Sequence, residues 1–251
     1  MLPVMYVPCK FRLYPFADQE RALLRALGEL KFLWNYALEQ RQHAWRKERR
    51  SLTYLDQCRD LARWRANDIK GLGRVYGHVA QECLHRLDDA FQHFFRRVAA
   101  GLKPGFPRFK ADMLSLTYPD ANGSAALMPG KNGTHRLHLS MVGDVPIKVH
   151  RAPPAGRVKT CTVKREGDRW FAVLTYEVAD PAPAPAVMPS APVGIDLGLT
   201  HLAVLSTGET VDAPKFLRAS EKRLRRAQRR LSRRQPGSKR RAKQVVKVEC
   251  L

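Results

Sequence analysis

The chain has 251 residues, and its 45 Lys and Arg against 23 Asp and Glu give it a net charge of +22. Hydrophobic residues make up 44% of it, which is typical of a globular chain and excludes a disordered tail. So large a positive excess indicates a polyanionic partner, most simply nucleic acid, with an anionic membrane as the alternative. The sequence has no apolar run of about 18 residues and no signal-peptide core. We therefore expect a cytoplasmic protein that neither spans a membrane nor is exported.

The cysteines indicate neither a disulfide framework nor a zinc site. There are five of them, they are widely spaced, and no two form a Cys-x-x-Cys pair. An odd number at such spacing predicts free thiols, and a four-cysteine zinc site cannot be built from it within this chain.

The first 110 residues are predicted to form a strand followed by helices. Alternating apolar residues predict the strand over 4–14, and Pro8 restricts it to a sheet edge or a broken start. Apolar stripes predict helices over 17–49 and 79–100, with another helix opened by a capping box at Thr53. The aromatic residues of these helices keep helical spacing, so we expect them in the core and not stacked on bases. They are Trp34, Trp45, Trp64, Phe91, Phe94 and Phe95.

Residues 101–110 break the helical pattern with two prolines and two glycines. Lys103, Arg108 and Lys110 are interleaved here with two phenylalanines. That mix suits a loop that clamps a nucleic-acid backbone and stacks on a base. The alternative is a linker whose aromatic side chains plug the core beneath it, and the sequence favours neither.

A change to period-two alternation predicts a β-rich region over residues 111–180. Short strands are expected near 114–118, 135–141 and 145–149, followed by a hairpin of 157–165 with 169–178. A small, partly basic β-barrel is the natural interpretation. The Pro/Ala-rich residues 181–192 then predict an extended linker at a domain boundary.

The stretch from Pro192 to Ser206 is predicted to form two buried strands joined by a tight turn. The first strand carries one carboxylate, Asp196, with an apolar residue on each side. A buried ionised side chain is costly unless something compensates it, and a metal ion at the strand end is one such compensation. The alternative is an Asp that caps a turn between Gly194 and Gly198.

Residues 215–247 are predicted to form one highly basic helix, because they hold fifteen Lys and Arg and one acid. A few apolar residues at seven-residue spacing form a narrow stripe along this helix. The basic surface around the stripe suits contact with a phosphate backbone. A solvated charged face is the alternative, but a net charge of +14 over this range favours nucleic acid. The candidate contacts are Arg223, Arg225, Arg226, Arg229, Arg230, Arg233, Arg234, Lys239, Arg240 and Arg241.

Three blocks of the sequence occur in the order found in one known family. They are Tyr6 to Trp45, with Lys31-Phe-Leu-Trp-Asn-Tyr-Ala; Phe94-Phe-Arg-Arg followed by Gly105-Phe-Pro-Arg-Phe-Lys; and Val193-Gly-Ile-Asp-Leu-Gly-Leu-Thr-His-Leu-Ala-Val. The first resembles the helix-turn-helix region of the transposon-encoded TnpB, or OrfB, proteins of bacterial insertion sequences. The second resembles the junction into their β-rich part, and the third the first strand and turn of their RuvC nuclease domain.

This resemblance implies an RNA-guided DNA endonuclease that pairs a guide RNA with target DNA and reads a short flanking motif. It implies an α+β multidomain fold. A helical, helix-turn-helix or REC-like region (1–110) is inserted in a wedge-like β-barrel (111–180). The start of an RNase H-like RuvC α/β domain (193–251) follows. Two Mg²⁺ ions about 4 Å apart would stabilise the attacking and leaving oxygens of a phosphodiester. By resemblance, Asp196 is the first of three catalytic carboxylates and a metal ligand.

The sequence departs from that family pattern after Asp196. The remaining acids are few, none falls at the family's later catalytic positions, and the family's Cys-x-x-Cys zinc ribbon is absent from this sequence. Residues 244–251 also leave the basic helical pattern. We therefore expect a gene truncated or frameshifted near 241–244, whose product binds RNA or DNA without cutting it.

Two other functions stay open at this point. One is a regulator that binds RNA or DNA without catalysis. The other is an ATPase, because Gly194-Ile-Asp-Leu-Gly-Leu-Thr also resembles the first phosphate loop of actin-like and sugar-kinase ATPases. The strong positive charge fits an ATPase poorly.

Overall fold

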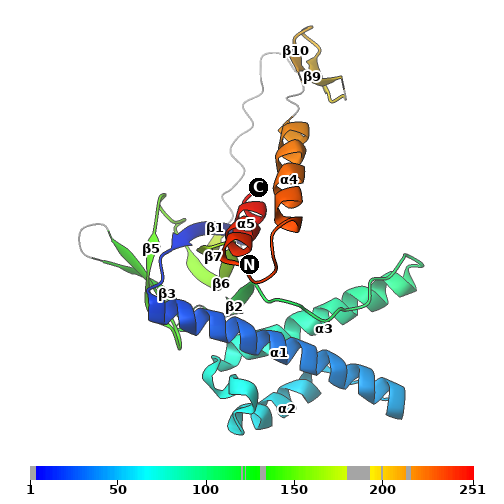
Figure 1. Cartoon of the computed structure of the whole chain (residues 1–251), viewed down its shortest axis with the longest axis vertical. Coiled ribbons are helices and arrows are strands. Elements are labelled where there is room, and N and C mark those ends of the chain that lie inside the picture. Colours follow the sequence, from blue (N-terminus) through cyan, green and yellow to red (C-terminus); the bar gives the residue numbers. More distant parts are fainter. Residues whose placement is uncertain are drawn as a thin grey trace. The chain divides into compact units, whose positions relative to one another are not determined.

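The computed structural model describes residues 4–119, 121, 123–130, 134–179, 193–198, 200–212 and 216–251, and of Leu217 and Ala219 it describes the backbone alone. The chain divides into two compact units, Met1–Asp180 (unit 1) and Pro181–Leu251 (unit 2), and most of their elements are labelled in Figure 1. The linker predicted over 181–192 lies outside the described residues and stays a prediction.

Unit 1 is built on one large antiparallel sheet of seven strands. Their order across the sheet is β2-β6-β7-β1-β5-β4-β3. With the helices described below, this confirms a mixed α and β fold. The strands are β1 (Val4–Leu13), β2 (Ser115–Tyr118), β3 (Ala125–Pro129), β4 (His135–Leu139), β5 (Gly143–Lys148), β6 (Arg157–Glu166) and β7 (Arg169–Ala179).

The sheet is strongly rolled. β2 and β3 are the first and last strands in this order. In a flat sheet with about 4.8 Å between neighbouring strands, these two strands would lie about 29 Å apart. The chain from Tyr118 to Ala125 spans at most about 25 Å when fully extended. The Tyr118 hydroxyl in addition donates a hydrogen bond of 3.0 Å to the carbonyl of Ser140, just beyond β4. Curling therefore brings the two ends toward each other, while a wedge-like barrel stays a prediction.

β1 is an inner strand, which revises the edge position predicted from Pro8. It pairs with β7 along its whole length and with β5 only at Arg12 and Leu13. Pro8 lies where β7 is the one neighbour described, so its missing N–H interrupts no second ladder. Cys9, Phe11 and Leu13 alternate onto the buried face of the strand.

The helices are inserted between β1 and β2. They are α1 (Ala17–Glu48), α2 (Tyr54–Ala66), the 3-10 turn η1 (Ile69–Arg74) and α3 (Gly77–Ala99). Their bounds confirm the predicted helices to within about two residues. Leucines at three- and four-residue spacing put one face of α1 into the core, and α3 packs against it.

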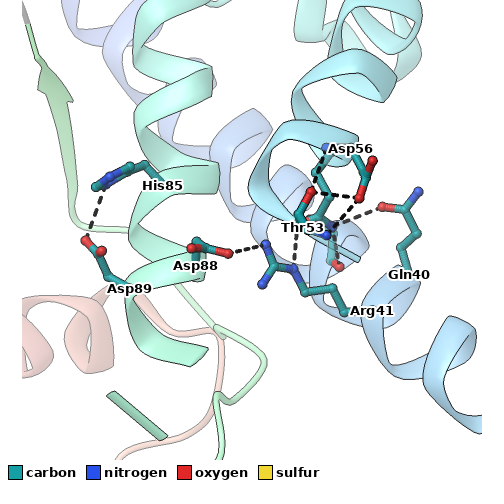
Figure 2. A network of polar contacts seen from close by, with 9 residues as sticks. Gln40, Arg41, Thr53, Asp56, His85, Asp88 and Asp89 are labelled. Carbon is teal, nitrogen blue, oxygen red and sulfur yellow. Dashed lines mark hydrogen bonds and ion pairs between the residues drawn. The ribbon is translucent and has the colours of Figure 1, made fainter. Parts of the chain in front are cut away.

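A buried arginine joins the three helices (Figure 2). Arg41 of α1 donates hydrogen bonds of 2.8 Å to Gln57 Oε1 of α2 and 2.8 Å to Asp88 Oδ1 of α3. Gln57 Nε2 in turn donates to the carbonyl of Ala37 at 2.9 Å. Because a buried charge needs a partner, these bonds fix how the helices lie against one another.

Unit 2 holds a small antiparallel sheet and two helices. The sheet has the order β10-β9-β8, with β8 at Ile195–Asp196, β9 at His201–Leu205 and β10 at Thr210–Asp212. The helices are α4 (Phe216–Ser232) and α5 (Lys239–Glu249). No helix in the described part of the chain is long and apolar enough to cross a membrane.

The single basic helix predicted over 215–247 is wrong, because the chain turns between α4 and α5. Pro236 cannot continue a helix, and Gly237 takes the left-handed conformation at φ 80°. Ser238 then begins α5 by accepting a hydrogen bond of 3.2 Å from the Arg241 N–H. Helix continues to Glu249, so the loss of helical pattern predicted from residue 244 is also wrong.

Candidate nucleic-acid interface

Asp196 is exposed, contrary to the prediction that it lies in a buried strand. Its neighbours Ile195 and Leu197 are 64% and 74% exposed. The backbone N–H of Gly194 bonds to Ser206 Oγ at 3.0 Å, and the Ser206 N–H bonds to the Gly194 carbonyl at 2.8 Å. These bonds close the β8–β9 hairpin. The predicted burial fails because, among the described residues, no layer covers the apolar side chains of these three short strands.

The described residues do not fit a two-metal site at Asp196. Its partner on β9 is Val204, which pairs on its other side with Thr210, so this row holds one carboxylate. Asp212 pairs instead with His201, whose Nδ1 lies 3.0 Å from Asp212 Oδ1. Across the described ranges, no group of three His, Cys, Asp or Glu residues could hold a metal ion.

Lys110 is held against the protein. Its backbone N–H donates to Asn35 Oδ1 at 2.8 Å, and its carbonyl accepts from Asn35 Nδ2 at 3.0 Å. The ammonium nitrogen sits 4.0 Å from the centre of the Trp34 ring. Partial burial lowers the pKa of Lys110, and the positive charge of Arg86 lowers it further. The Lys110 side chain therefore packs on Trp34 within unit 1, and its contact with phosphate stays one of the two alternatives left open by the sequence.

The rest of the 101–110 loop combines both alternatives left open by the sequence. Phe106 packs edge-on against Phe91 and Phe94 of α3, with ring centres 5.5 and 5.2 Å apart. Phe109 is 54% exposed, and the side chains of Lys103 and Arg108 are exposed as well. The loop therefore closes over α3 while presenting cations and one aromatic ring to solvent.

The α4–α5 hairpin is held together by small and polar groups. Ala227 of α4 is buried, and its carbonyl accepts a hydrogen bond of 3.1 Å from Gln244 of α5. Arg241 Nη1 donates to the carbonyls of Leu231 at 3.1 Å and Arg234 at 3.2 Å. Carbonyls at the end of a helix have no hydrogen-bond partner within it, and Arg241 supplies one at the end of α4. Its Nη1 group is therefore occupied by the protein.

The other predicted basic residues of the hairpin all lie exposed. A hollow of about 420 Å³ on α4 is lined by five of its cations and by Glu221. A row of uncompensated cations on one helix suits a phosphate backbone, which neutralises several of them at once. The exposed predicted contacts are Arg223, Arg225, Arg226, Arg229, Arg230, Arg233, Arg234, Lys239 and Arg240.

Two aromatic residues that the sequence placed in the core are instead exposed. Trp34, Trp64 and Phe91 are buried as expected, but Trp45 and Phe95 are 53% and 54% exposed. Both lie near the C-terminal ends of their helices and are followed at once by basic residues. The flanking cations at the helix ends were the available signal that these positions reach solvent.

Two family models match the chain. The model of the OrfB protein of IS605, described as a probable transposase, matches residues 173–251, and the helix-turn-helix domain of the same protein matches residues 5–50. A Streptomyces pristinaespiralis protein named "Putative RNA-guided DNA endonuclease" is 34% identical over 244 residues, which cover 95% of this chain and 58% of the relative. The Escherichia coli K12 protein "Putative RNA-guided DNA endonuclease InsQ" is 29% identical over 221 residues, covering 86% and 51%.

Among solved structures, a Cas12f1–sgRNA–target DNA complex matches 98% of this chain and 65% of its own with 12% identity and a TM-score of 0.38. So low a score carries no argument. The chain spans a little over half the length of the two relatives named above. The two family models match one segment in unit 1 and one that runs from β7 through unit 2, in the order in which the sequence resembles that family. The chain belongs to the OrfB, or TnpB, family of insertion-sequence proteins.

Proposed function

We propose that this chain binds guide RNA and target DNA as the nucleic-acid-binding portion of an RNA-guided DNA endonuclease of its family. The observation that carries the proposal is the α4–α5 hairpin, which presents nine exposed Arg and Lys side chains of the predicted set. The names of the two relatives support the choice of RNA and DNA as partners.

Binding without hydrolysis is part of the same proposal. Phosphodiester hydrolysis by the family's mechanism needs carboxylates that hold two metal ions, and the described residues bring no second carboxylate to Asp196. The isolated chain would therefore bind nucleic acid and leave it intact. Where Asp196 and further carboxylates are brought together, Mg²⁺ would stabilise the charge on the scissile phosphate.

Salt-dependent binding tests the first half of the proposal. A fluorescent single-stranded RNA and a DNA duplex are titrated with the chain at several salt concentrations. Replacing Arg225, Arg226, Arg229 and Arg230 by Gln should weaken binding about tenfold or more and reduce the slope of log affinity against log salt concentration by up to about 3 for the RNA and about 4 for the duplex. The matched control neutralises Arg59, Arg63, Arg74 and Arg169, which already face carboxylates. Equal losses in both variants would contradict a role for the hairpin.

A cleavage assay tests the second half. The chain is incubated with a family guide RNA, matching target DNA and Mg²⁺, and the DNA is expected to stay intact while Asp196→Ala binds it unchanged. Cleavage that Asp196→Ala abolishes would overturn the proposed inactivity.

We further propose the domain division at 1–110, 111–180, 181–192 and 193–251, with a REC-like helical region inserted in a wedge-like barrel. The order of elements supports it, because α1 to α3 lie between two strands of one sheet. Limited proteolysis is expected to cut within 181–192 and release a stable fragment that ends near residue 180. A first cut within 101–130 would contradict the linker.

A further inference from the structure

A largely apolar pocket of about 600 Å³ lies between the C-terminal ends of α1 and α3. This volume is within the range of about 300–1,000 Å³ typical of small-molecule sites. Five aromatic rings from α1, α3 and the following loop line it, so it offers flat surfaces on several sides. We call it the aromatic pocket, and its rings are those of Trp45, Phe91, Phe94, Phe95 and Phe106.

The aromatic walls are preformed. Phe106 meets Phe91 and Phe94 edge-on, at interplanar angles of 88° and 82°. The loop that carries Phe106 is fixed by two flanking contacts, a hydrogen bond of 3.0 Å from Trp34 Nε1 to the Arg108 carbonyl and the pair between Asn35 and Lys110. Fixed rings cost little conformational entropy when a ligand binds.

The charges around the pocket are positive. Arg41 lies behind Phe91, with its guanidinium carbon 4.9 Å from the ring centre, and Asp88 neutralises it. Arg46 donates to the neutral Oε1 of Gln42 at 3.1 Å, so its positive charge has no acidic partner among the contacts described. Arg50 also lines the pocket, but Glu48 neutralises it at 2.9 Å, so Arg46 is the lining cation available to a ligand, and no Asp or Glu lines the pocket. The pocket therefore selects a ligand that is flat, apolar and attached to negative charge.

We infer that the aromatic pocket takes one unstacked base of a single-stranded nucleic acid, with the adjoining phosphate held by Arg46. Aromatic rings bind every base through its flat face, and arginine pairs with phosphate oxygens in a bidentate manner. The inference rests on the proposed function and adds to it a second contact, located in unit 1. A second copy of the chain fits less well, because two chains of +22 repel each other.

The test uses a single-stranded oligonucleotide that carries one 2-aminopurine, whose fluorescence falls when the base stacks on an aromatic ring. Trp45 and Phe95 are both replaced by Ala, which should leave the fold intact because the two side chains are about half exposed. The variant is expected to bind about tenfold or more weakly and to lose the quenching. The matched control is Tyr14→Ala, an aromatic side chain 50% exposed and outside the pocket, which should match the parent chain.

A second variant, Arg46→Gln, keeps the aromatic rings and removes one charge. It is expected to weaken binding, to reduce the salt dependence by about one charge and to leave the quenching at saturation in place. Thermal melting of each variant, followed by circular dichroism, checks that the fold is retained. If Arg46→Gln binds as the parent chain does, Arg46 holds no phosphate and the inference is overturned.

The remaining outcomes separate this inference from the proposed function. If neutralising the α4 arginines weakens binding while the Trp45 and Phe95 variant binds and quenches as the parent does, the pocket inference fails and the proposed function stands. If the parent chain binds no nucleic acid, both fail. If the parent self-associates in sedimentation experiments and the aromatic variant abolishes only that, the pocket is a protein interface and the inference is overturned.

Discussion

Unit 1 and unit 2 use their apolar residues in opposite ways. In unit 1, strands and helices bury a continuous core that runs from Cys9 to Tyr176. In unit 2, Ala227 is the one buried hydrophobic residue among those described, while Ile195, Leu197 and Leu202 are about half exposed or more. Since burial of apolar surface is the main source of stability, unit 1 carries most of the folding free energy.

The difference in buried apolar surface separates the source of stability, in unit 1, from the most basic surface, in unit 2. Unit 1 has a continuous core of its own, whereas the hairpin of unit 2 presents positive charge that is best compensated by a polyanion. Nucleic acid should therefore stabilise unit 2 more than unit 1, because a ligand that binds only the folded form raises its stability.

The largest expected effect comes from deleting a buried leucine of unit 1. Leu84 is 0% exposed, so Leu84→Ala should lower the free energy of unfolding by about 2–5 kcal/mol, measured by urea denaturation. Leu202→Ala in unit 2, at a site 48% exposed, should change it by no more than about 0.5 kcal/mol. Equal losses at the two sites would erase the contrast between the units.

Breaking the arginine network in Figure 2 should have the next largest effect. Asp88→Ala leaves the Arg41 guanidinium buried without its carboxylate, at a cost of about 3 kcal/mol in the free energy of unfolding, the lower end of the range for buried pairs because Asp88 is 23% exposed. The neighbouring Asp89, paired with His85 at 3.3 Å on the surface, serves as the control, and Asp89→Ala should cost less than about 1 kcal/mol. Adding Arg41→Met to Asp88→Ala should recover much of the loss. No recovery would show that the charge itself was not the cause.

Two helix caps allow the same chemical change in both units. Thr53 accepts a hydrogen bond of 3.3 Å from the Asp56 N–H in unit 1, and Ser238 accepts one of 3.2 Å from the Arg241 N–H in unit 2. Replacing either by Ala should cost about 1 kcal/mol locally. Thr53→Ala should shift the urea midpoint of unit 1, whereas Ser238→Ala should leave that midpoint unchanged and weaken RNA binding. A midpoint shift of unit 1 in Ser238→Ala would show that the units unfold together.

The smallest expected effect concerns pH and the surface of unit 1. Hydrogen bonds from Lys10, at 2.8 Å, and Lys164 lower the pKa of Glu166 from its ordinary value of 4.5. A lowered pKa in the folded state stabilises the fold above pH 4.5 and loses this contribution as the pH falls through the lowered value. Because all three side chains are at least a third exposed, Glu166→Gln should cost less than about 1 kcal/mol at pH 7. Denaturation curves of the two proteins should converge in acid, and a gap that widens in acid would contradict this account.

The helices and the clearest hairpin could be predicted because their signals are local. Leucines at three- and four-residue spacing define the buried face of α1, and the turn at Gly167 and Asp168 defines the hairpin of β6 and β7. β3 was missed because Ala125–Pro129 shows no alternation, and it becomes a strand through its pairing with β4. The break between α4 and α5 was signalled by Pro236 and Gly237, but the run of charge around them masked it.

The candidate site was less predictable, because exposure depends on neighbours that are distant in the chain. Nothing next to Asp196 in the sequence says whether a layer covers its strand, and in the described residues none does. Trp45 and Phe95 keep the spacing of core residues. Each nevertheless lies near the C-terminal end of its helix, where its side chain is about half exposed and lines the aromatic pocket. The exposure of most cations in the α4–α5 hairpin follows from the sequence, because so dense a run of charged side chains is rarely buried, while their contact with nucleic acid stays a prediction.

The inner position of β1 also sets an order of events during synthesis. Val4 pairs with Ala179 and Leu13 with Trp170, so the first strand to leave the ribosome waits for the last strand of unit 1. The three helices between β1 and β2 make contacts closer in sequence and can form in the meantime. Until β7 arrives, the edge of β1 that pairs with it has no partner strand. The nascent chain is therefore most exposed to aggregation in that interval, and translation speed across 157–179 should influence how much protein folds.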